Sequence, residues 1–503
     1  MTIKLLRIRK TKTASGSTSV QIVYYRDRKV IVEKHIGSGK TEEAIGTLIL
    51  KAQHWIESRS TQQELFALKA PLELSPQNLR LIGVTHQFTY QLLECIAVKC
   101  GMTMPKDRFL FDFSIMRLIE PTSKLRAITL LSRYFSIDYS ERTVYRKMGT
   151  IIQDKKRIEA IAVQCAKNLL QDDLSMVLYD VTTLYFETFK SDELRKEGFS
   201  KDNKPQQPQI VIGLLVTREG FPLGYEVFAG NTFEGKTMLN VLQSFIKQHG
   251  VNKPIVVADA AMLSHKNIEE LQRQELFYIV GARLGNTAGA IIKEAVTKLR
   301  QQDGSSARVK TTSGDLIVEF SGKRYRKDKY EMEKLVERAK QIVENKLAVK
   351  NVKFIKHKSK SKDYKLNDEL IDKAKLLLGM KGYYTNVSET VFSDKEIIDR
   401  YHDLWHVEHS FRIAKSDLAS RPIFHYSEQA IASHILICFT ALMIAKYLES
   451  LTKLSLRQII DAIWQIKEVL LLNTLTDTSF TIRSDFSLLA KDILRKIDPN
   501  LSY

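Results

Sequence analysis

The chain is 503 residues long, and at roughly 150 residues per domain this length predicts about three domains rather than one compact core. Its 77 Lys and Arg residues outnumber its 58 Asp and Glu residues, so the net charge of +19 favours a polyanionic partner, nucleic acid first. Its four cysteines lack CxxC spacing, which excludes a structural zinc site and indicates a reduced cytoplasm.

Residues 1–75 are predicted to form a small α+β module. Short β-like runs at 19–27 and 29–37 precede a helical pattern at 41–58. The N-terminus lacks the apolar core of a signal peptide, so we expect the protein to stay in the cytoplasm.

Residues 76–172 carry apolar side chains at helical spacing and are predicted to form a helical region. Within it, Ser140 is expected to cap the N-terminus of a short helix. That helix carries three basic residues, Arg142, Arg146 and Lys147. They fit a DNA-recognition helix of the helix-turn-helix kind, and equally the solvated basic face of a bundle helix.

Residues 173–283 change to a strand-rich texture. Five strands are predicted, at 174–187, 209–217, 221–231, 254–260 and 276–284. Short turns link the first three strands, whereas helices link the later ones. This order predicts a mixed sheet in an α/β domain.

The rest of the chain is predicted to be a basic segment of mixed pattern at 284–393, followed by helices at 394–445 and 446–503. The Lys-rich run at 353–365 is typical of a solvated loop, and it also suits a surface that follows phosphates. Polar residues interrupt the most apolar stretch, 430–449, so a buried helix is predicted there and no membrane partner is expected.

Asp180 is the one carboxylate near the middle of an apolar, β-branched run, VLYDVTTLYFE. An ionised Asp without a partner in such a strand costs several kcal/mol. A hydrogen-bond network, a basic partner or a metal ion must therefore compensate its charge.

Asp259 ends the predicted strand PIVVADA, directly before a helix. Ligands bind at the carboxyl ends of strands in open α/β sheets, so this position is a candidate for an active site. The alternative is that Asp259 only caps the following turn or helix.

Glu408 lies in a predicted helix at 394–418, where steps of three and four residues place it on the apolar stripe. Tyr401 and Lys415 are each seven residues, or two helical turns, from Glu408, so all three are expected to point the same way. The alternative for Glu408 is a solvated surface charge.

Together, Asp180, Asp259 and Glu408 would form an oxygen-only site of the kind that hard divalent cations prefer. Two Mg²⁺ ions, with Mn²⁺ as a substitute, could activate water or a 3′-hydroxyl and stabilise the leaving oxygen of a phosphoryl transfer. We therefore expect a metal to compensate the charge of Asp180.

Several blocks resemble, in order and separation, the DDE transposases of bacterial insertion sequences in the IS-four superfamily. They are YDVTTLYFE, GFSKDNKPQQPQIVIGLLVTREGFPLGYEVFAGNTFEGKT, VVADAAMLS and YHDLWHVEHSFRIAKSDLASRPIFH, and the resemblance covers most of residues 110–445. It implies an RNase H-like mixed sheet with helices on both faces, and Asp180, Asp259 and Glu408 as its metal-binding triad. The catalytic core would comprise 173–283 and 394–445, interrupted by a mainly β domain inserted at 284–393.

The resemblance also concerns DNA contacts. The signature around the glutamate reads Tyr401, Leu404, Glu408 and Lys415, with Leu404 where relatives have Arg. Arg400 or Arg412 would then replace that contact. The predicted DNA-binding residues are therefore Tyr401, Arg412, Lys415, Arg142, Arg146 and Lys147.

Some relatives stack a flipped base on a tryptophan of the insertion. The three tryptophans of this chain, Trp55, Trp405 and Trp464, lie outside that segment. Phe320, Tyr325 or another aromatic side chain would have to take this place if a base is flipped here.

The sequence thus predicts a transposase that binds terminal inverted repeats, cleaves DNA and joins 3′ ends to target DNA, as a homodimer associated with the bacterial nucleoid. Two alternatives stay open: a metal-dependent nuclease of the same fold that does not join strands, and a DNA-binding protein without catalysis.

Overall fold

The computed structural model describes residues 6–498 except 15, 27–28, 58–75, 105, 263, 301, 346–351 and 358–363. It divides into two compact units. Unit 1 comprises Met1–Tyr90, Arg133–Ser136 and Ile463–Ser487, and unit 2 comprises Gln91–Ser132, Ile137–Ala462 and Leu488–Tyr503.

A small antiparallel sheet and one helix occupy the N-terminal part of unit 1. Its strands are β1 (Arg7–Lys12), β2 (Thr18–Arg26) and β3 (Lys29–Gly39), and the helix is α1 (Glu42–Glu57). Val20 and Ile22 alternate onto one face of β2 and form a core with Ala52 of α1. Strands β2 and β3 and the helix lie where the sequence pattern predicted them.

A second three-stranded sheet in unit 1 joins distant parts of the chain in the order β16-β15-β4. The strands are β4 (Leu79–Thr85), β15 (Glu468–Asn473) and β16 (Thr478–Arg483). The prediction that 446–503 is helical is therefore wrong over this hairpin, and the predicted helical region at 76–172 begins with a strand. Because β15 is stabilised by pairing with a strand from the other end of the chain, its local pattern was a poor guide.

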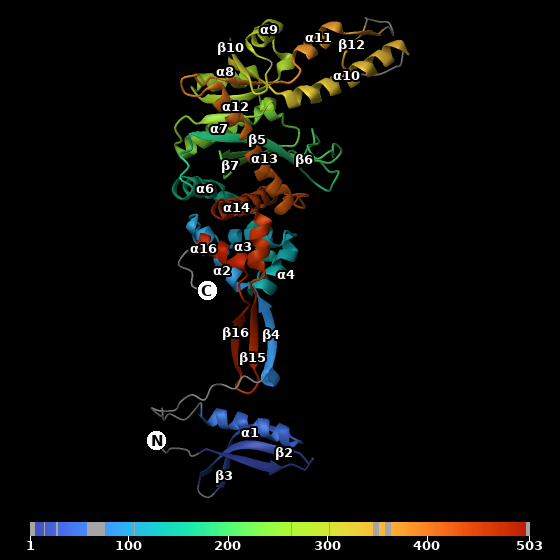
Figure 1. The fold of residues 1–503 in the computed structure, drawn as a ribbon. Helices are drawn as coiled ribbons and strands as arrows, with labels where there is room; N and C mark the ends of the chain where they lie inside the picture. The colour runs from blue at the N-terminus through green and yellow to red at the C-terminus, as the bar shows by residue number, and fades with distance from the viewer. Residues whose placement is uncertain are drawn as a thin grey trace. The chain divides into compact units, whose positions relative to one another are not determined.

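One eight-stranded mixed sheet forms the framework of unit 2, and its strand order is β10-β11-β14-β9-β8-β5-β6-β7. Figure 1 labels β5, β6, β7 and β10 of this sheet. Its strands are β5 (Met176–Tyr185), β6 (Gln209–Thr217), β7 (Pro222–Ala229), β8 (Ile255–Ala258), β9 (Phe277–Ala282), β10 (Ser306–Thr311), β11 (Gly314–Phe320) and β14 (Met380–Thr385). Strands β5, β8 and β9 are parallel, whereas β6 is antiparallel to both of its neighbours, β5 and β7. The predicted mixed sheet is confirmed.

Helices cover both faces of this sheet, and their contacts identify the face on which Asp180 lies. On one face, the Tyr179 hydroxyl donates to Thr237, beside α7 (Met238–His249), over 2.7 Å. On the other face, Thr182 of β5 lines a cavity with Phe439 of α14 (Glu428–Thr452). Since side chains alternate along a strand, Asp180 shares the face of Thr182.

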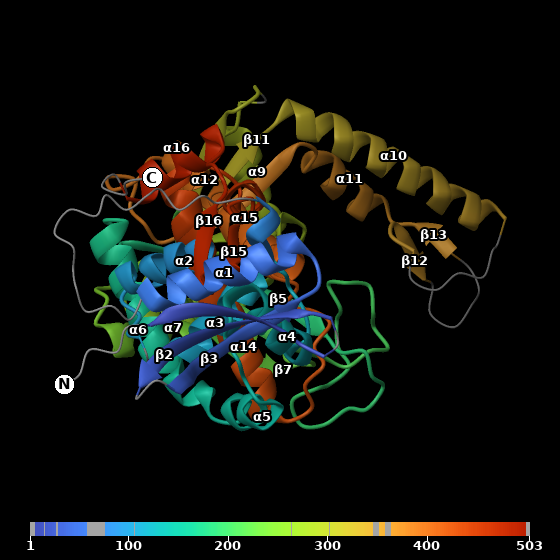
Figure 2. The same ribbon diagram turned by 90° about the horizontal axis from the view of Figure 1, so that it is seen from below.

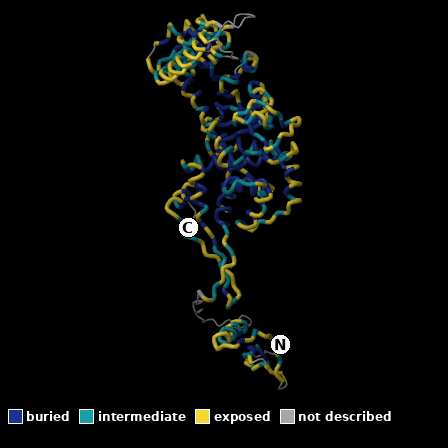
Figure 3. The backbone as a smooth tube through the Cα atoms, turned by 90° about the vertical axis from the view of Figure 1, so that its right-hand side faces the viewer, coloured by how far each residue is buried: buried dark blue, intermediate teal, exposed yellow. Residues whose placement is uncertain are grey.

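Helix α14 is buried, as predicted for the apolar stretch 430–449. It is long and apolar enough to cross a membrane, but 94% of its most apolar window lies inside the protein. Figure 3 shows how buried backbone gathers in the middle of unit 2. In the sequence, further helices lie between β4 and β5 and after α14. They are α2 (Gln87–Lys99), α3 (Arg108–Ile119), α4 (Lys124–Phe135), α5 (Glu141–Met148) and α6 (Lys155–Leu169), and then α15 (Leu456–Trp464) and α16 (Leu488–Ile497).

The segment at 284–393 is richer in helix than predicted, so the prediction of a mainly β segment is wrong for its described residues. Strands β10, β11 and β14 extend the large sheet, and the short strands β12 (Ile355–His357) and β13 (Tyr364–Leu366) pair with each other. The helices are α9 (Gly289–Lys298), α10 (Gly322–Glu344) and α11 (Asp368–Leu376), and α11 lies alongside α10 in Figures 1 and 2.

The sequence of α10 explains why it is helical. Ser321 caps its N-terminus by accepting a hydrogen bond from the Arg324 amide, and ion pairs at four-residue spacing, such as Arg324 with Asp328 at 3.2 Å, follow along the helix. Ala339 of α10 packs with Ile371 of α11 and with Phe354, and these buried residues form a small separate core against α10.

We expect Gly213→Ala to destabilise the sheet beneath the candidate site. A Cβ atom at Gly213 in β6 would lie 2.3 Å from the hydroxyl oxygen of Tyr179, so the tyrosine would have to leave Thr237. Overpacking of this kind costs about 1–3 kcal/mol of folding stability.

Thermal denaturation measures the change, with Gly46→Ala as control. Gly46 lies inside α1 with nothing within 4 Å of the added Cβ, so that change should stabilise the protein. An unchanged midpoint for Gly213→Ala would contradict the expectation.

Candidate active site

Asp180 has a basic partner in the structure. Lys201, from the loop between β5 and β6, places its Nζ 3.9 Å from an Asp180 carboxylate oxygen and 3.1 Å from one of Glu234. The ammonium also donates to the Val181 carbonyl over 2.6 Å. Of the three predicted ways to compensate Asp180, the structure therefore shows the basic partner.

Burial is the main cause that raises the pKa of Asp180, to about 6. The Lys201 charge and a backbone hydrogen bond at Val181 act in the opposite direction, while the charges of Asp259 and Glu234 raise the pKa further. These contributions place two more carboxylates, Asp259 and Glu234, within electrostatic reach of Asp180.

Asp259 directly follows β8, as predicted, and its side chain is exposed. One carboxylate oxygen accepts hydrogen bonds from the Tyr401 hydroxyl over 3.0 Å and from the Ala260 amide over 2.7 Å. The Ala260 contact is the turn-capping role considered for Asp259. The Tyr401 contact ties this strand end to the helices that carry the glutamate.

The predicted single helix at 394–418 is divided into three pieces. They are α12 (Asp394–His402), α13 (Trp405–Arg412) and a π-helical turn, Ile413–Asp417. Between α12 and α13, the Leu404 and His406 amides bond to carbonyls only three residues back. This tight connection changes the helical phase, so a seven-residue step no longer equals two regular turns.

Glu408 is exposed, so the prediction that it lies on a buried stripe is wrong. Trp405, from the same predicted stripe, is 54% exposed. The break at 403–404 is the physical reason, and Arg218 helps to fix it by pairing with Asp403 at 2.7 Å. Exposure leaves the Glu408 carboxylate accessible to a ligand.

Tyr401 nevertheless lies within electrostatic reach of all three predicted acids. Burial raises the pKa of its phenol, and so do the charge of Asp259, with which it hydrogen-bonds, and the charges of Asp180 and Glu408. Lys381 of β14 lies over the Tyr401 ring, with its Nζ 4.7 Å from the ring centre. Burial lowers the pKa of Lys381, as does the charge of Arg324, whereas nearby carboxylates, among them Asp259 and Glu408, oppose the shift.

Lys415 lies after the end of α13, the helix that carries Glu408. It lies in the π-helical turn and pairs with Asp202 at 3.4 Å, and Arg421 pairs with the same carboxylate. Burial lowers the pKa of Lys415. Because Asp202 follows Lys201 in the chain, this cluster anchors the loop that delivers Lys201 to Asp180.

The other predicted DNA contacts lie on separate elements. Arg142, Arg146 and Lys147 are exposed on α5, whose predicted N-cap is confirmed by the hydrogen bond from the Thr143 amide to Ser140 over 3.2 Å. Arg412 is exposed at the end of α13.

Two further sets of residues were singled out by the resemblance: Arg400 and Leu404 in the signature around Glu408, and Phe320 and Tyr325 as candidates to stack on a flipped base. Arg400 is 3.8 Å from Asp403, and Leu404 is buried. Phe320 is buried, and its ring centre lies 6.0 Å from that of Tyr325.

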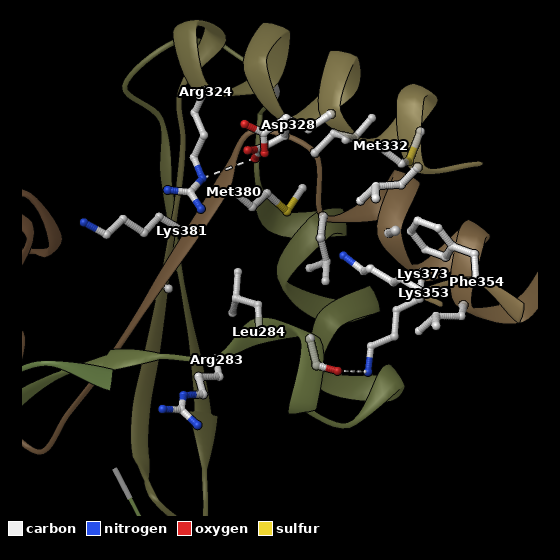
Figure 4. A pocket seen from close by; sticks show the side chains of 18 of the residues that line it. Arg283, Leu284, Arg324, Asp328, Met332, Lys353, Phe354, Lys373, Met380 and Lys381 are labelled. Carbon is white, nitrogen blue, oxygen red and sulfur yellow. Dashed lines mark hydrogen bonds and ion pairs between the residues drawn. The ribbon is translucent and has the colours of Figure 1, made fainter. Parts of the chain in front are cut away.

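A basic pocket of about 420 Å³ adjoins this region through Lys381 and Arg324 (Figure 4). Its basic side chains are Arg283, Arg324, Lys353, Lys373 and Lys381, and its apolar side chains include Leu284, Met332, Phe354 and Met380. Lys373 is occupied by the carbonyls of Gly285 and Thr287, at 2.8 and 2.9 Å. Asp328 and Glu331 also line the pocket, and Arg324 pairs with Asp328 at 3.2 Å, so Arg283, Lys353 and Lys381 are the cations that suit an anionic ligand beside the acids.

The donor set fits a hard divalent cation. Asp180, Asp259 and Glu408 offer carboxylate oxygens only, and the Lys201 ammonium already stands as a cation beside Asp180. Across the described residues, no three His, Cys, Asp or Glu side chains come close enough together to form a ready metal site. The carboxylates would therefore have to draw together around an ion.

Sequence reasoning missed Lys201, Glu234 and Lys381. The first two belong to the block GFSKDNKPQQPQIVIGLLVTREGFPLGYEVFAGNTFEGKT, which carried the resemblance, but they lie in a loop and a short 3₁₀ turn that no helical or strand spacing relates to Asp180. Lys381 lies in a strand of the segment predicted to be a separate domain, so no sequence signal placed it near the acids.

Comparison with known proteins adds a family match. A family model described as a transposase DDE domain matches residues 172–444. The comparison with curated proteins finds no match. Among solved structures, a piggyBac transposase synaptic complex with hairpin DNA is similar with a TM-score of 0.36 and 11% sequence identity, over 92% of this chain and 80% of that one.

Proposed function

Since the chain belongs to the transposase DDE domain family, we propose that it is a DNA transposase that cleaves DNA strands at the ends of its element and joins their 3′ ends to target DNA. The observation that carries the proposal is geometric: Asp180 lies within β5, Asp259 directly follows the parallel neighbour β8, and Tyr401, whose hydroxyl donates to Asp259 over 3.0 Å, lies seven residues before Glu408. These are the carboxylates that the resemblance assigns to the triad, and they come from two strands and a helix far apart in the sequence.

The catalytic domain that we propose is RNase H-like. The arrangement of β7-β6-β5-β8-β9, with three antiparallel strands followed by two parallel ones, supports this proposal. Asp180 lies within β5 and Asp259 at the end of its parallel neighbour β8, so both carboxylates belong to adjacent strands.

The triad would hold divalent ions, which the family generally uses, and we propose Mg²⁺ with Mn²⁺ as a substitute. When bound, the ions supply activation of the attacking water or 3′-hydroxyl and stabilisation of the leaving oxygen. Tyr401 holds Asp259 through its hydroxyl, which fixes the carboxylate at the strand end. Lys381 keeps a cation beside Asp259 and Glu408, where a DNA phosphate would lie.

The DNA would extend from this site over basic surfaces. We propose that Arg412 and Lys415, which follow the glutamate by four and seven residues, contact DNA near the cleaved bond, Lys415 after exchanging Asp202 for a phosphate. The exposed Arg142, Arg146 and Lys147 on α5 would contact the terminal inverted repeats. A homodimer that pairs two ends, associated with the bacterial nucleoid in the cytoplasm, completes the proposal.

A metal-dependent nuclease is the alternative for the same site. Purified protein, Mg²⁺ and DNA that carries the element's own ends, with products resolved by strand, separate the two functions. The transposase should yield joined products of 3′ ends and target DNA, whereas a nuclease would yield cleaved strands alone. Binding without cleavage under all metal conditions would favour the catalytically inactive alternative.

DNA binding should weaken steeply with salt, because the net charge of +19 favours contacts with phosphates. On duplex DNA the slope of log K against log salt is about −0.9 per phosphate neutralised. If Lys147 contacts a phosphate, Lys147→Ala should make the slope shallower by about that amount in a fluorescence anisotropy titration.

Lys298→Ala is the matched control for this titration. Lys298 is a half-exposed lysine of α9 that pairs with Glu294 at 2.8 Å. Equal slopes for the Lys147 and Lys298 variants would assign α5 to a solvated bundle face instead.

A further inference from the structure

Lys201 occupies the position of a cation among the acids of the candidate site. Its Nζ lies 3.1 Å from Glu234 and 3.9 Å from Asp180, and it donates to the Val181 carbonyl over 2.6 Å. Its three nearest partners are thus all oxygens, two of them carboxylate oxygens. Such an oxygen environment is also what a divalent ion requires.

Glu234 brings a fourth carboxylate to the acids. It begins a short 3₁₀ turn, Glu234–Lys236, which contacts the turn Ala260–Met262 that directly follows Asp259. Its side chain is 22% exposed, and its charge acts on Asp180 in the same direction as that of Asp259. Without Lys201, these carboxylates would repel one another with no positive charge between them.

The backbone of Lys201 is fixed, whereas its side chain is long and flexible. The Lys201 amide donates to the Thr183 hydroxyl over 3.1 Å, and the next residue, Asp202, is held by Lys415 and Arg421. The ammonium can therefore leave the carboxylates through side-chain rotation alone, without movement of the loop.

We propose that Lys201 is an internal counter-ion that competes with the divalent metal for Asp180 and Glu234, and that leaves them when metal and DNA arrive. This inference rests on the proposed function, since it assumes that the triad holds metal. Lys201 neutralises the acids in the metal-free enzyme, and a DNA phosphate offers its ammonium another anion. Metal and DNA should consequently bind cooperatively, because both favour the displaced side chain.

The test measures Mn²⁺ binding to the full chain without DNA, by electron paramagnetic resonance or calorimetry. Lys201→Gln should bind Mn²⁺ roughly tenfold more tightly than the unchanged protein, because one unit charge close to the ligands is removed. Lys201→Arg keeps the charge and should bind like the unchanged protein. If Lys201→Gln does not fold, Lys201→Met, which keeps the apolar stem, serves instead.

Lys204→Gln is the matched control, because Lys204 belongs to the same loop but pairs with Glu187 at 3.3 Å. It should leave Mn²⁺ affinity nearly unchanged. Equal or weaker Mn²⁺ binding by Lys201→Gln, or an equal gain from Lys204→Gln, would overturn the proposal. Failure of every protein to bind Mn²⁺, the unchanged one included, would instead contradict the proposed function and remove the basis of the inference.

A second measurement needs no metal. In EDTA, Lys201→Gln should lower the thermal midpoint, because the carboxylates lose their counter-charge, and adding Glu234→Gln should restore part of the loss. If Glu234→Gln lowered the midpoint equally with and without Lys201, the two side chains would be independent, and the counter-ion role would be wrong.

DNA supplies the third readout. A DNA duplex should increase the Mn²⁺ affinity of the unchanged protein more than that of Lys201→Gln, since the variant has no ammonium to displace. An equal increase in both proteins would overturn the coupling.

Discussion

Asp180→Ala, Asp259→Ala and Glu408→Ala should each abolish DNA cleavage, with a loss of roughly 10³-fold or more, as found when one member of a catalytic set is removed. Binding to terminal DNA should stay close to that of the unchanged protein, because the three carboxylates would hold metal and not bases. Gel-resolved cleavage in Mg²⁺ and fluorescence anisotropy measure the two properties separately.

Asp417→Ala is the control for this series. Asp417 is an exposed carboxylate at the end of the π-helical turn that follows α13. Its removal should leave cleavage nearly intact. Near-normal cleavage by any one triad variant would show that this residue is wrongly assigned.

Asp180→Asn should stabilise the metal-free protein above pH 6. The pKa of Asp180 is raised from 3.8 to about 6, chiefly by burial, so the folded state prefers the protonated acid. The stability that this preference provides is fully present below about pH 4 and is lost as the pH rises through 6. A shift of about two pKa units corresponds to roughly 3 kcal/mol as an upper bound.

Thermal denaturation in EDTA between pH 4 and pH 8 measures this effect. The advantage of Asp180→Asn should grow from near zero at pH 4 to its full value above pH 6. Asp173→Asn is a control of opposite sign, because a hydrogen bond from the Ser175 amide lowers the pKa of Asp173. A variant of Asp180 that is destabilised at pH 8 would show that Lys201 compensates the charge fully.

The sheet could be predicted well from the sequence because its signals are local. Runs of β-branched residues gave β5 to β9, and Asp259 was placed correctly since it follows a short apolar run. The pairing of β15 with β4 joins segments about 390 residues apart and leaves no local trace. Helix α10 was missed although its cap and ion pairs are local.

The acidic residues of the candidate site were predicted from the sequence, but its basic residues, Lys201 and Lys381, were not. Asp180 stood out because a lone charge in an apolar strand needs a partner. Lys201 reaches it from a loop, and Lys381 from a later strand, so only the folded chain brings them together. The exposure of Glu408 accompanies the break between α12 and α13 at residues 403–404, which a helical wheel cannot show.

We expect Asp180, Asp259 and Glu408 to hold the divalent ions that act on DNA. Anomalous diffraction from crystals of the protein with terminal DNA and Mn²⁺ tests it most directly, because it locates the metal. We expect anomalous peaks within about 2.0–2.6 Å of carboxylate oxygens of all three residues, with the Lys201 ammonium displaced from Asp180. Peaks that lie away from these carboxylates would contradict it.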